Sequence, residues 1–456
     1  MKNSIRSRSV NFWRTAFWFF PAVLLVIAGC VSQRIIWAPD GKQAAVIADD
    51  GLYLCDAQGK LSALLAPRAT RAAWFKDSRR LAFVRVDRCT NWNGVASLLK
   101  PQVLDSIRQD AAGLAAKFRS RPAKEVVEAE KTEVGKDILA VRMLYLRDQS
   151  QEADLKSMRA DAEWREIEAD ISTLVVATVG EGTLQAGPGI ATEIGSVEDV
   201  RVSPTGAGIA FTVPAGRGAR LLVCGADAGT PARVITSHCA EYPDWSADGN
   251  SLVYIAAANT NSTDDLLLAV LARRQVFDGG GQWAGKPAQD ELAGLVFNDH
   301  TRVRCLRDGR IIFSSEEWRL PVTTNDLPQR QQLFALDPER QSTLTRLVPH
   351  STYEQLPAGL SYFEVSPDDT RVAFGGDKGM VAVLTLASGN VEVLQNSSDA
   401  GLKSVPSWRS ATELCYIGAQ ESKTNTIKWE VMLAGNGKTN VISRQWPDTV
   451  RKGFLD

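Results

Sequence analysis

Short apolar runs separated by polar turns recur along almost the whole chain, and seven of them share one pattern. In each copy an apolar residue, often Trp, precedes a short Asp/Gly/Ser turn and a second apolar run. This order predicts strand, tight turn, strand. The copies are WAPDGKQAAVIA (37–48), WFKDSRRLAFVR (74–85), VSPTGAGIAFTV (202–213), WSADGNSLVYIA (245–256), CLRDGRIIFSS (305–315), VSPDDTRVAFGG (365–376) and WRSATELCYIG (408–418).

Two further apolar stretches follow most copies, so each unit contains four short strands. A unit of this size cannot bury its own apolar face and must stack on its neighbours. Four-stranded antiparallel units of about forty residues are typical of β-propeller blades. We therefore predict an all-β chain with a single propeller of seven blades, or alternatively six, over residues 30–446, followed by a C-terminal tail at 447–456.

One interval between copies is much longer than the others. The second and third copies start 128 residues apart, whereas their neighbours start 37 and 43 residues apart. Apolar residues at helical spacing predict a helical insertion at 97–170, within the second blade. Because the segment mixes acidic and basic residues, a solvated helical hairpin is one interpretation. A partner-docking arm is the other.

The first residues have the layout of a secretory signal peptide. A positive leader precedes an apolar stretch at 16–27, and small residues follow it. The ending Ile27-Ala28-Gly29-Cys30 resembles the lipobox of bacterial lipoproteins, which implies cleavage after residue 29 and acylation of Cys30. In a Gram-negative cell, Val31 in place of Asp favours, by the same resemblance, the periplasmic face of the outer membrane. The alternative is an uncleaved membrane helix.

The charge composition of the chain limits the classes of partner that we expect. The chain has 52 basic and 53 acidic residues, which argues against nucleic acid, because phosphate binding needs a dense positive surface. Six cysteines remain when Cys30 is set aside. An oxidising envelope permits disulfides, but the spacing predicts no particular pairing.

The W-S-P-D-G-x-x-(I/L)-A-F pattern is best matched by the copies at 37–48, 245–256 and 365–376. It resembles the WD40-like repeat of TolB, which also occurs in the propellers of prolyl-oligopeptidase-type peptidases. The resemblance covers nearly everything from Gln33 to Ser443 apart from the helical insertion. It implies a propeller fold.

The repeat residues themselves are predicted to be structural. An indole at the first position can wedge between adjacent blades, and the turn Asp can accept a hydrogen bond from the backbone two residues on. Pro and Gly in the same turns supply the required backbone angles. These residues are Trp37, Trp74, Trp245, Trp408, Asp40, Gly41, Asp248, Gly249, Pro367 and Asp368.

No catalytic or metal-binding motif is found in the sequence. The three histidines are isolated, no paired Cys motif occurs, and no G-x-S-x-G elbow is present. We therefore expect no cofactor, no metal and no catalysis. The predicted function is a lipid-anchored, non-catalytic envelope propeller that binds a protein, a peptide or another ligand, or that serves as a scaffold. The alternative is a carbohydrate-active enzyme, a glycosidase or lyase, that uses carboxylates in the central channel.

Overall fold

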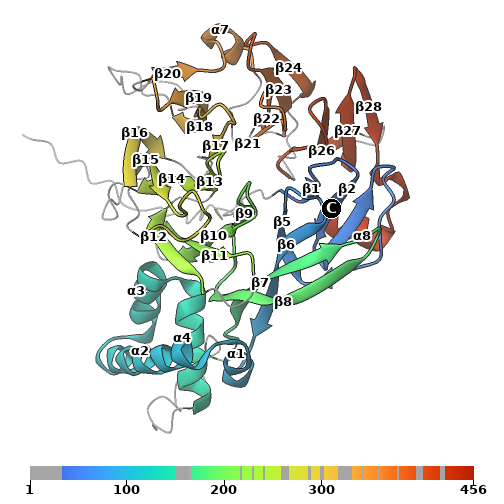
Figure 1. The fold of residues 1–456 in the computed structure, drawn as a ribbon. Coiled ribbons are helices and arrows are strands. Elements are labelled where there is room, and N and C mark those ends of the chain that lie inside the picture. The colour runs from blue at the N-terminus through green and yellow to red at the C-terminus, as the bar shows by residue number, and fades with distance from the viewer. Residues whose placement is uncertain are drawn as a thin grey trace, which may run out of the picture. The chain divides into compact units, whose positions relative to one another are not determined.

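The computed structural model describes most of the chain after residue 32, and its main architecture is a series of antiparallel β-sheets (Figure 1). The all-β prediction is confirmed. The described residues are 33–149, 164, 166–215, 218–227, 231–239, 242–257, 267–285, 289–297, 302–316, 331–340, 343–356, 360, 362–376, 379–396, 404–421 and 427–455.

The strands form seven four-stranded blades, so the seven-bladed form of the prediction is correct. Within each blade, strands that follow one another in the chain pair antiparallel. The first three blades are β1 (Ile35–Trp37), β2 (Gln43–Ala48), β3 (Gly51–Asp56), β4 (Ala66–Pro67); β5 (Ala69–Trp74), β6 (Arg80–Cys89), β7 (Ala169–Val179), β8 (Leu184–Ile194); and β9 (Asp199–Val202), β10 (Gly208–Ala215), β11 (Gly218–Gly225), β12 (Arg233–Cys239).

The remaining four blades follow the same order. The third and fourth blades are additionally joined by one pairing, Cys239 with Ala256. Their strands are β13 (Asp244–Trp245), β14 (Ser251–Ala257), β15 (Leu267–Gln275), β16 (Gln289–Phe297); β17 (Val303–Cys305), β18 (Ile311–Glu316), β19 (Gln331–Asp337), β20 (Thr343–Arg346); β21 (Tyr362–Val365), β22 (Arg371–Gly375), β23 (Val381–Thr385), β24 (Val391–Gln395); and β25 (Ser407–Trp408), β26 (Glu413–Glu421), β27 (Ile427–Gly435), β28 (Lys438–Val441).

The core of the propeller is divided among the seams between blades. Successive side chains of a strand point to opposite faces, so each blade packs against both neighbours. Every pair of successive blades shares one buried apolar cluster, and one further cluster joins the last blade to the first. In that closing cluster Trp37 and Val46 pack with Cys415 and Ile417. The seams therefore close the blades into a ring.

Residues from the two ends of the propeller also form hydrogen bonds across the closing seam. The Arg34 amide donates to Ser404 Oγ at 3.0 Å, and Trp446 Nε1 donates to the Gly59 carbonyl at 2.9 Å. Trp446 follows a short 3-10 helix, η1 (Ser443–Gln445), and precedes α8 (Asp448–Leu455). The segment expected to be a tail thus contains a helix that packs against the first and last blades.

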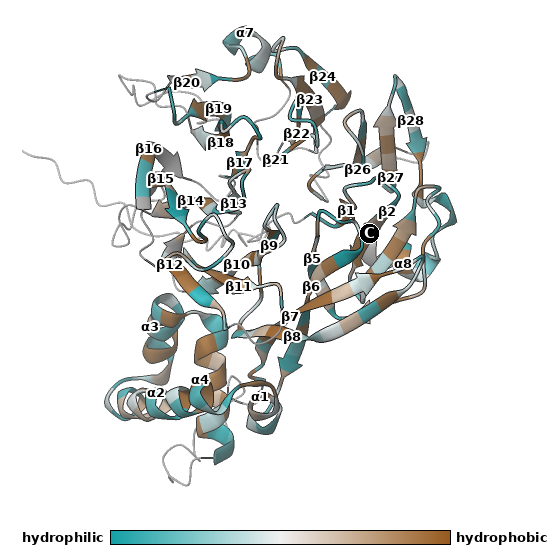
Figure 2. Ribbon diagram, in the orientation of Figure 1, coloured by the Kyte–Doolittle hydropathy of each residue, from teal (hydrophilic) through white to brown (hydrophobic). Residues whose placement is uncertain are grey.

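The predicted helical insertion lies between β6 and β7, where it was expected, but it is more than a hairpin. Pro101, Pro122 and Gly135 divide it into several helices with a shared buried core that includes Trp92 and Leu144. Figure 2 shows hydrophobic and hydrophilic residues along α2. Its helices are α1 (Trp92–Leu98), α2 (Pro101–Ser120), α3 (Ala123–Val134) and α4 (Lys136–Gln149).

Two predicted features lie outside the described residues. These are the leader with Cys30, and residues 150–163 of the insertion. Elsewhere, α7 (His350–Tyr353) is a single turn between blades five and six. Of the helices the structure describes, none combines the length and apolar character needed to cross a membrane.

Candidate functional site

The repeat tryptophans lie between blades. Three of them donate a hydrogen bond from the indole to a backbone carbonyl of the preceding blade. Trp74 Nε1 donates to the Ile36 carbonyl at 2.8 Å. Equivalent bonds reach the Arg201 carbonyl from Trp245 and the Glu364 carbonyl from Trp408, both at 3.0 Å. The backbone one residue before the repeat position is therefore tied to the next blade.

Trp37 occupies the same place at the closing seam. Its indole lies beneath the Arg409 guanidinium, with 5.1 Å from Cζ to the ring centroid. Trp37 and Trp74 also line the cavity described below.

The turn residues are placed in tight turns between the first and second strands. The Asp40, Asp248 and Asp368 carboxylates each accept the amide two residues on. Gly41 and Gly249 have φ angles of 68° and 72°, a region that disfavours other residues. The Pro367 carbonyl accepts a hydrogen bond from Arg307 of the preceding blade.

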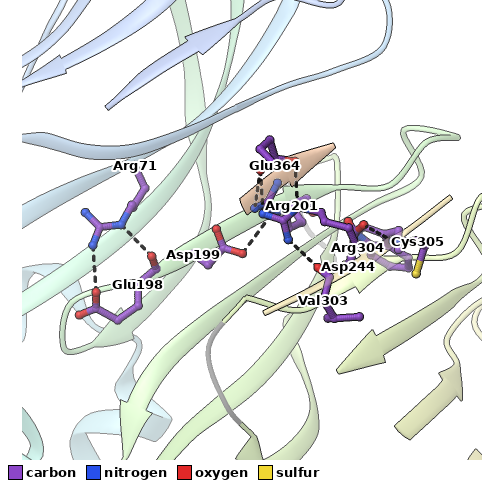
Figure 3. Close-up of polar contacts among 10 residues, drawn as sticks. Arg71, Glu198, Asp199, Arg201, Asp244, Val303, Arg304, Cys305 and Glu364 are labelled. Carbon is purple, nitrogen blue, oxygen red and sulfur yellow. Dashed lines mark hydrogen bonds and ion pairs between the residues drawn. The ribbon is translucent and has the colours of Figure 1, made fainter. Parts of the chain in front are cut away.

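A column of charged residues stands one position before the repeat in blades three to six. These residues belong to the innermost strands and are Arg201, Asp244, Arg304 and Glu364. Arg304 Nε and Nη2 each donate to a separate Glu364 oxygen at 2.9 Å, a bidentate pair (Figure 3). The Cys305 amide donates to Asp244 Oδ2 at 2.9 Å.

A second column of charged residues lies two residues before the first column in the sequence. These positions are in the innermost strands or directly precede them. Its members include Arg71, Asp199 and Arg302. Arg71 Nη2 donates to Glu198 Oε2 at 2.9 Å, and Asp199 Oδ2 accepts from Arg201 Nε at 3.1 Å (Figure 3). Asp199, Arg201, Glu364 and Arg304 thus form one series of ion pairs along the inner strands, and Arg71 and Glu198 form a separate pair.

Arg302 lies within an aromatic sandwich. Its Cζ is 3.7 Å from the ring centroid of Tyr242 and 4.6 Å from that of Tyr362. The side chain is fully buried, and burial lowers its pKa, with a partial offset from Tyr242. Tyr242 has a φ angle of 67°, which is uncommon for an aromatic residue and marks local backbone strain.

A cavity of about 250 Å³ opens among these residues at the centre of the ring. Its apolar wall includes Ile36, Ala72, Ala73 and Val200. Its charged lining consists of three arginines and three carboxylates, namely Arg71, Arg201, Arg302, Glu198, Asp199 and Asp244. A concave site with an apolar wall and a few convergent polar groups is the usual form of a ligand pocket.

Some of these charged groups are engaged by the protein and others face the cavity. Arg201 makes one side-chain hydrogen bond within the described residues, to Asp199, and its Nη2 is 3.8 Å from Glu364 Oε2. Its terminal nitrogens have no hydrogen-bond acceptor in that part of the chain. One oxygen each of Asp199 and Asp244 is likewise without a donor among the residues described.

The two carboxyl groups of the first column have opposite pKa shifts. Burial alone would raise the pKa of Glu364, but the charges of Arg304 and Arg201 lower it to about 2. Burial raises the pKa of Asp244, and Arg304, Arg201 and the Cys305 amide offset this only in part. Asp244 is thus the carboxyl group of the cavity that takes up a proton more readily than an ordinary Asp.

Sequence reasoning missed the channel residues because it assigned the repeats from their apolar and turn positions. A signal was present one residue upstream. Aligning the copies places Ile36, Ala73, Arg201, Asp244, Arg304, Glu364 and Ser407 in one column, and four consecutive members are charged. Charge at an inner strand position of a propeller indicates a channel lining. No three His, Cys, Asp or Glu side chains gather as a metal site within the described ranges.

These features define a seven-bladed propeller with a charged central cavity. No protein-family model and no curated protein matches the sequence. Among solved structures, a puromycin hydrolase has a TM-score of 0.47 and 13% identity, over 91% of this chain and 51% of that one. An oligogalacturonate lyase from Vibrio parahaemolyticus has 0.43 and 12%, over 77% and 75%.

A TolB-like protein from Agrobacterium tumefaciens has a TM-score of 0.34 and 16% identity, over 53% of this chain and 82% of that one. The seven four-stranded blades confirm the propeller prediction. The present chain spans about half the length of the puromycin hydrolase.

The expectation that the chain has no catalysis is wrong as it was stated. It rested on missing sequence motifs, yet the solved structures similar to this chain include a hydrolase and a lyase. A cavity assembled from single residues of separate blades leaves no contiguous motif in the sequence. The fold itself does not decide between binding and catalysis.

Proposed function

We propose that this protein is an envelope-bound propeller that binds a small polar ligand in its central channel. One observation carries the proposal. The cavity of about 250 Å³ is lined by Arg201, Asp199 and Asp244, whose side chains keep hydrogen-bonding atoms that the described protein does not use. Donors and acceptors that converge on a concave site can pair with a ligand that offers the complementary groups, and these pairs give the ligand both affinity and orientation.

Thermal unfolding of the full-length protein with defined small molecules tests this proposal. The panel contains glucose, N-acetylglucosamine, glucuronate and alanyl-alanine, because together they vary charge at similar size. A ligand of the folded state raises the melting temperature with concentration. The shift should disappear in Arg201→Ala and persist in Arg310→Ala, an exposed arginine paired with Asp308. Equal shifts in both variants would place binding elsewhere.

A second candidate function is acid–base catalysis on the channel ligand. The specific observation is the pKa of Asp244, raised by burial, at a cavity that also contains Asp199 and Arg201. A carboxyl group with a raised pKa holds a proton more readily than an ordinary Asp and is better suited to act as a general acid. This candidate keeps the carbohydrate-active alternative suggested by channel carboxylates. Product formation that survives unchanged in Asp244→Asn would exclude it.

We also propose that Cys30 is acylated and anchors the propeller at the periplasmic face of the outer membrane. The support is the lipobox-like ending Ile27-Ala28-Gly29-Cys30. A diacylglycerol and an amide-linked chain contribute about 0.8 kcal/mol per buried methylene, enough for stable anchoring. Labelled fatty acid should attach to the natural protein and not to Cys30→Ser. Equal labelling of both proteins would place the fatty acid elsewhere, and no labelling of either would favour an uncleaved membrane helix.

A further inference from the structure

We infer that the ligand of the central cavity is a neutral, polyhydroxylated molecule, that is, an uncharged sugar unit. This inference rests on the proposed function and narrows it to one chemical class. It follows from the charge balance of the lining, the pairs already formed there, the atoms left over and the apolar wall.

The charged lining is balanced before any ligand enters. Three arginines, Arg71, Arg201 and Arg302, face three carboxylates, Glu198, Asp199 and Asp244. A charged ligand would bring an uncompensated charge into the cavity, and it would lose part of its hydration there. The balance therefore favours a ligand without net charge.

The existing pairs oppose an anionic group in particular. A ligand carboxylate at Arg201 would lie beside Asp199, which is already 3.1 Å from Arg201 Nε, and would share the cavity with Asp244. Arg71 is engaged by both the backbone and the side chain of Glu198, at 2.8 and 2.9 Å. The third arginine, Arg302, is held between the rings of Tyr242 and Tyr362. An anion beside the partly engaged Arg201 guanidinium would therefore also meet the repelling carboxylates of Asp199 and Asp244.

The atoms left over suit hydroxyl groups. The Arg201 terminal nitrogens can only donate, whereas the remaining oxygens of Asp199 and ionised Asp244 can only accept. A hydroxyl group does both, so neighbouring hydroxyls on one ring can accept from Arg201 and donate to a carboxylate at the same time. A ligand with only acceptors or only donors would satisfy half of the set.

The remaining wall suits the carbon skeleton of a sugar. Ile36, Ala72, Ala73 and Val200 provide small apolar contacts, and the indoles of Trp37 and Trp74 lie beside them. The volume of about 250 Å³ is just below the roughly 300–1,000 Å³ typical of drug-sized ligand sites. One saccharide unit, free or at the end of a chain, is therefore the appropriate size.

Isothermal titration of the full-length protein in detergent tests the inference, with glucose, galactose and N-acetylglucosamine compared with glucuronate, glucosamine and alanyl-alanine. At least one neutral sugar should bind at least tenfold more tightly than its charged counterpart, and raising the salt from 0.05 to 0.5 M should change its affinity less than twofold. Arg201→Ala should weaken binding about tenfold or more. Asp244→Asn, which keeps the side-chain shape, should weaken it severalfold, while Arg310→Ala should leave it unchanged.

The possible outcomes distinguish the neutral-sugar inference from the proposed ligand site in the channel, on which it rests. Preferential binding of glucuronate, glucosamine or alanyl-alanine that is lost in Arg201→Ala would overturn the neutral-sugar assignment and leave the channel site standing. Sugar binding that survives in both Arg201→Ala and Asp244→Asn would overturn the assignment to this cavity. The absence of binding by every compound would overturn both.

Discussion

Asp244 and Glu364 occupy equivalent positions in their repeats, yet their surroundings shift their pKa values in opposite directions. Glu364 meets Arg304 in a bidentate pair, which holds its pKa at about 2. Asp244 is buried without such a fork, and its pKa is raised. Glu364 is therefore suited to fixing two blades together. Asp244 is suited to exchanging a proton or a hydrogen bond with a ligand.

Replacing Asp244 with Asn should stabilise the propeller at neutral pH. A carboxyl group whose folded pKa is raised stabilises the fold below its ordinary pKa of 3.8, and this contribution is lost as the pH rises through the folded value. Asn keeps an acceptor for the Cys305 amide and carries no charge. The melting temperature of the variant relative to the natural protein should therefore rise between pH 4 and pH 7.

Asp308→Asn, in an exposed turn, is the matched control. A difference in melting temperature between Asp244→Asn and the natural protein that is the same at pH 4 and pH 7 would contradict the assignment of a raised pKa.

The turns and helix ends could be predicted from the sequence wherever residues adjacent in the chain determine them. The turns around Asp40 and Asp248 and the break near Pro122 follow from residues adjacent in the chain. The cavity depends on the approach of β1, β5, β9 and β13 after folding. No local rule pairs Arg201 with Glu364 or places Arg302 between Tyr242 and Tyr362, so these contacts required the structure.

The helical insertion has its own buried core, and it should unfold without the propeller. Leu144 in α4 is fully buried in the cluster shared by α1 to α4. A carboxylate placed there would be buried without a partner, so Leu144→Asp should disrupt these helices. Limited proteolysis should then cleave within 92–149 while the blades remain protected.

Leu64→Asp, at a half-exposed site in the first blade, is the control for the added charge and should leave the cleavage pattern unchanged. Loss of blade protection in Leu144→Asp would show that insertion and propeller form one cooperative unit.

At the scale of the whole molecule, ring closure depends on packing at a single seam. Each blade is contiguous in sequence, so no strand from one end of the chain completes a blade at the other. Trp446 instead inserts into the cluster between the last and first blades and bonds to Gly59. The repeats predicted the blades, but the short segment after the last repeat carries no repeat signal and its role at the seam could not be predicted.

Trp446→Ala should therefore destabilise the whole ring. Truncation of a buried Trp costs about 3–5 kcal/mol, and the Gly59 carbonyl also loses its donor. Urea unfolding should show this loss, with a smaller one in Trp283→Ala, whose indole is only partly buried. Equal losses of unfolding free energy in the two variants would show that the closing seam contributes no more to stability than Trp283 does.

Entry of the ligand into the central channel should be visible in the hydrogen–deuterium exchange of the inner strands. With a saturating concentration of the tightest neutral sugar from the titrations, amides of β5, β9 and β13 should exchange more slowly, because bound ligand restrains the inner strands. The outer strands and helices α1 to α4 should be unchanged. Protection confined to the outer strands or to the insertion, with none in the inner strands, would contradict the account.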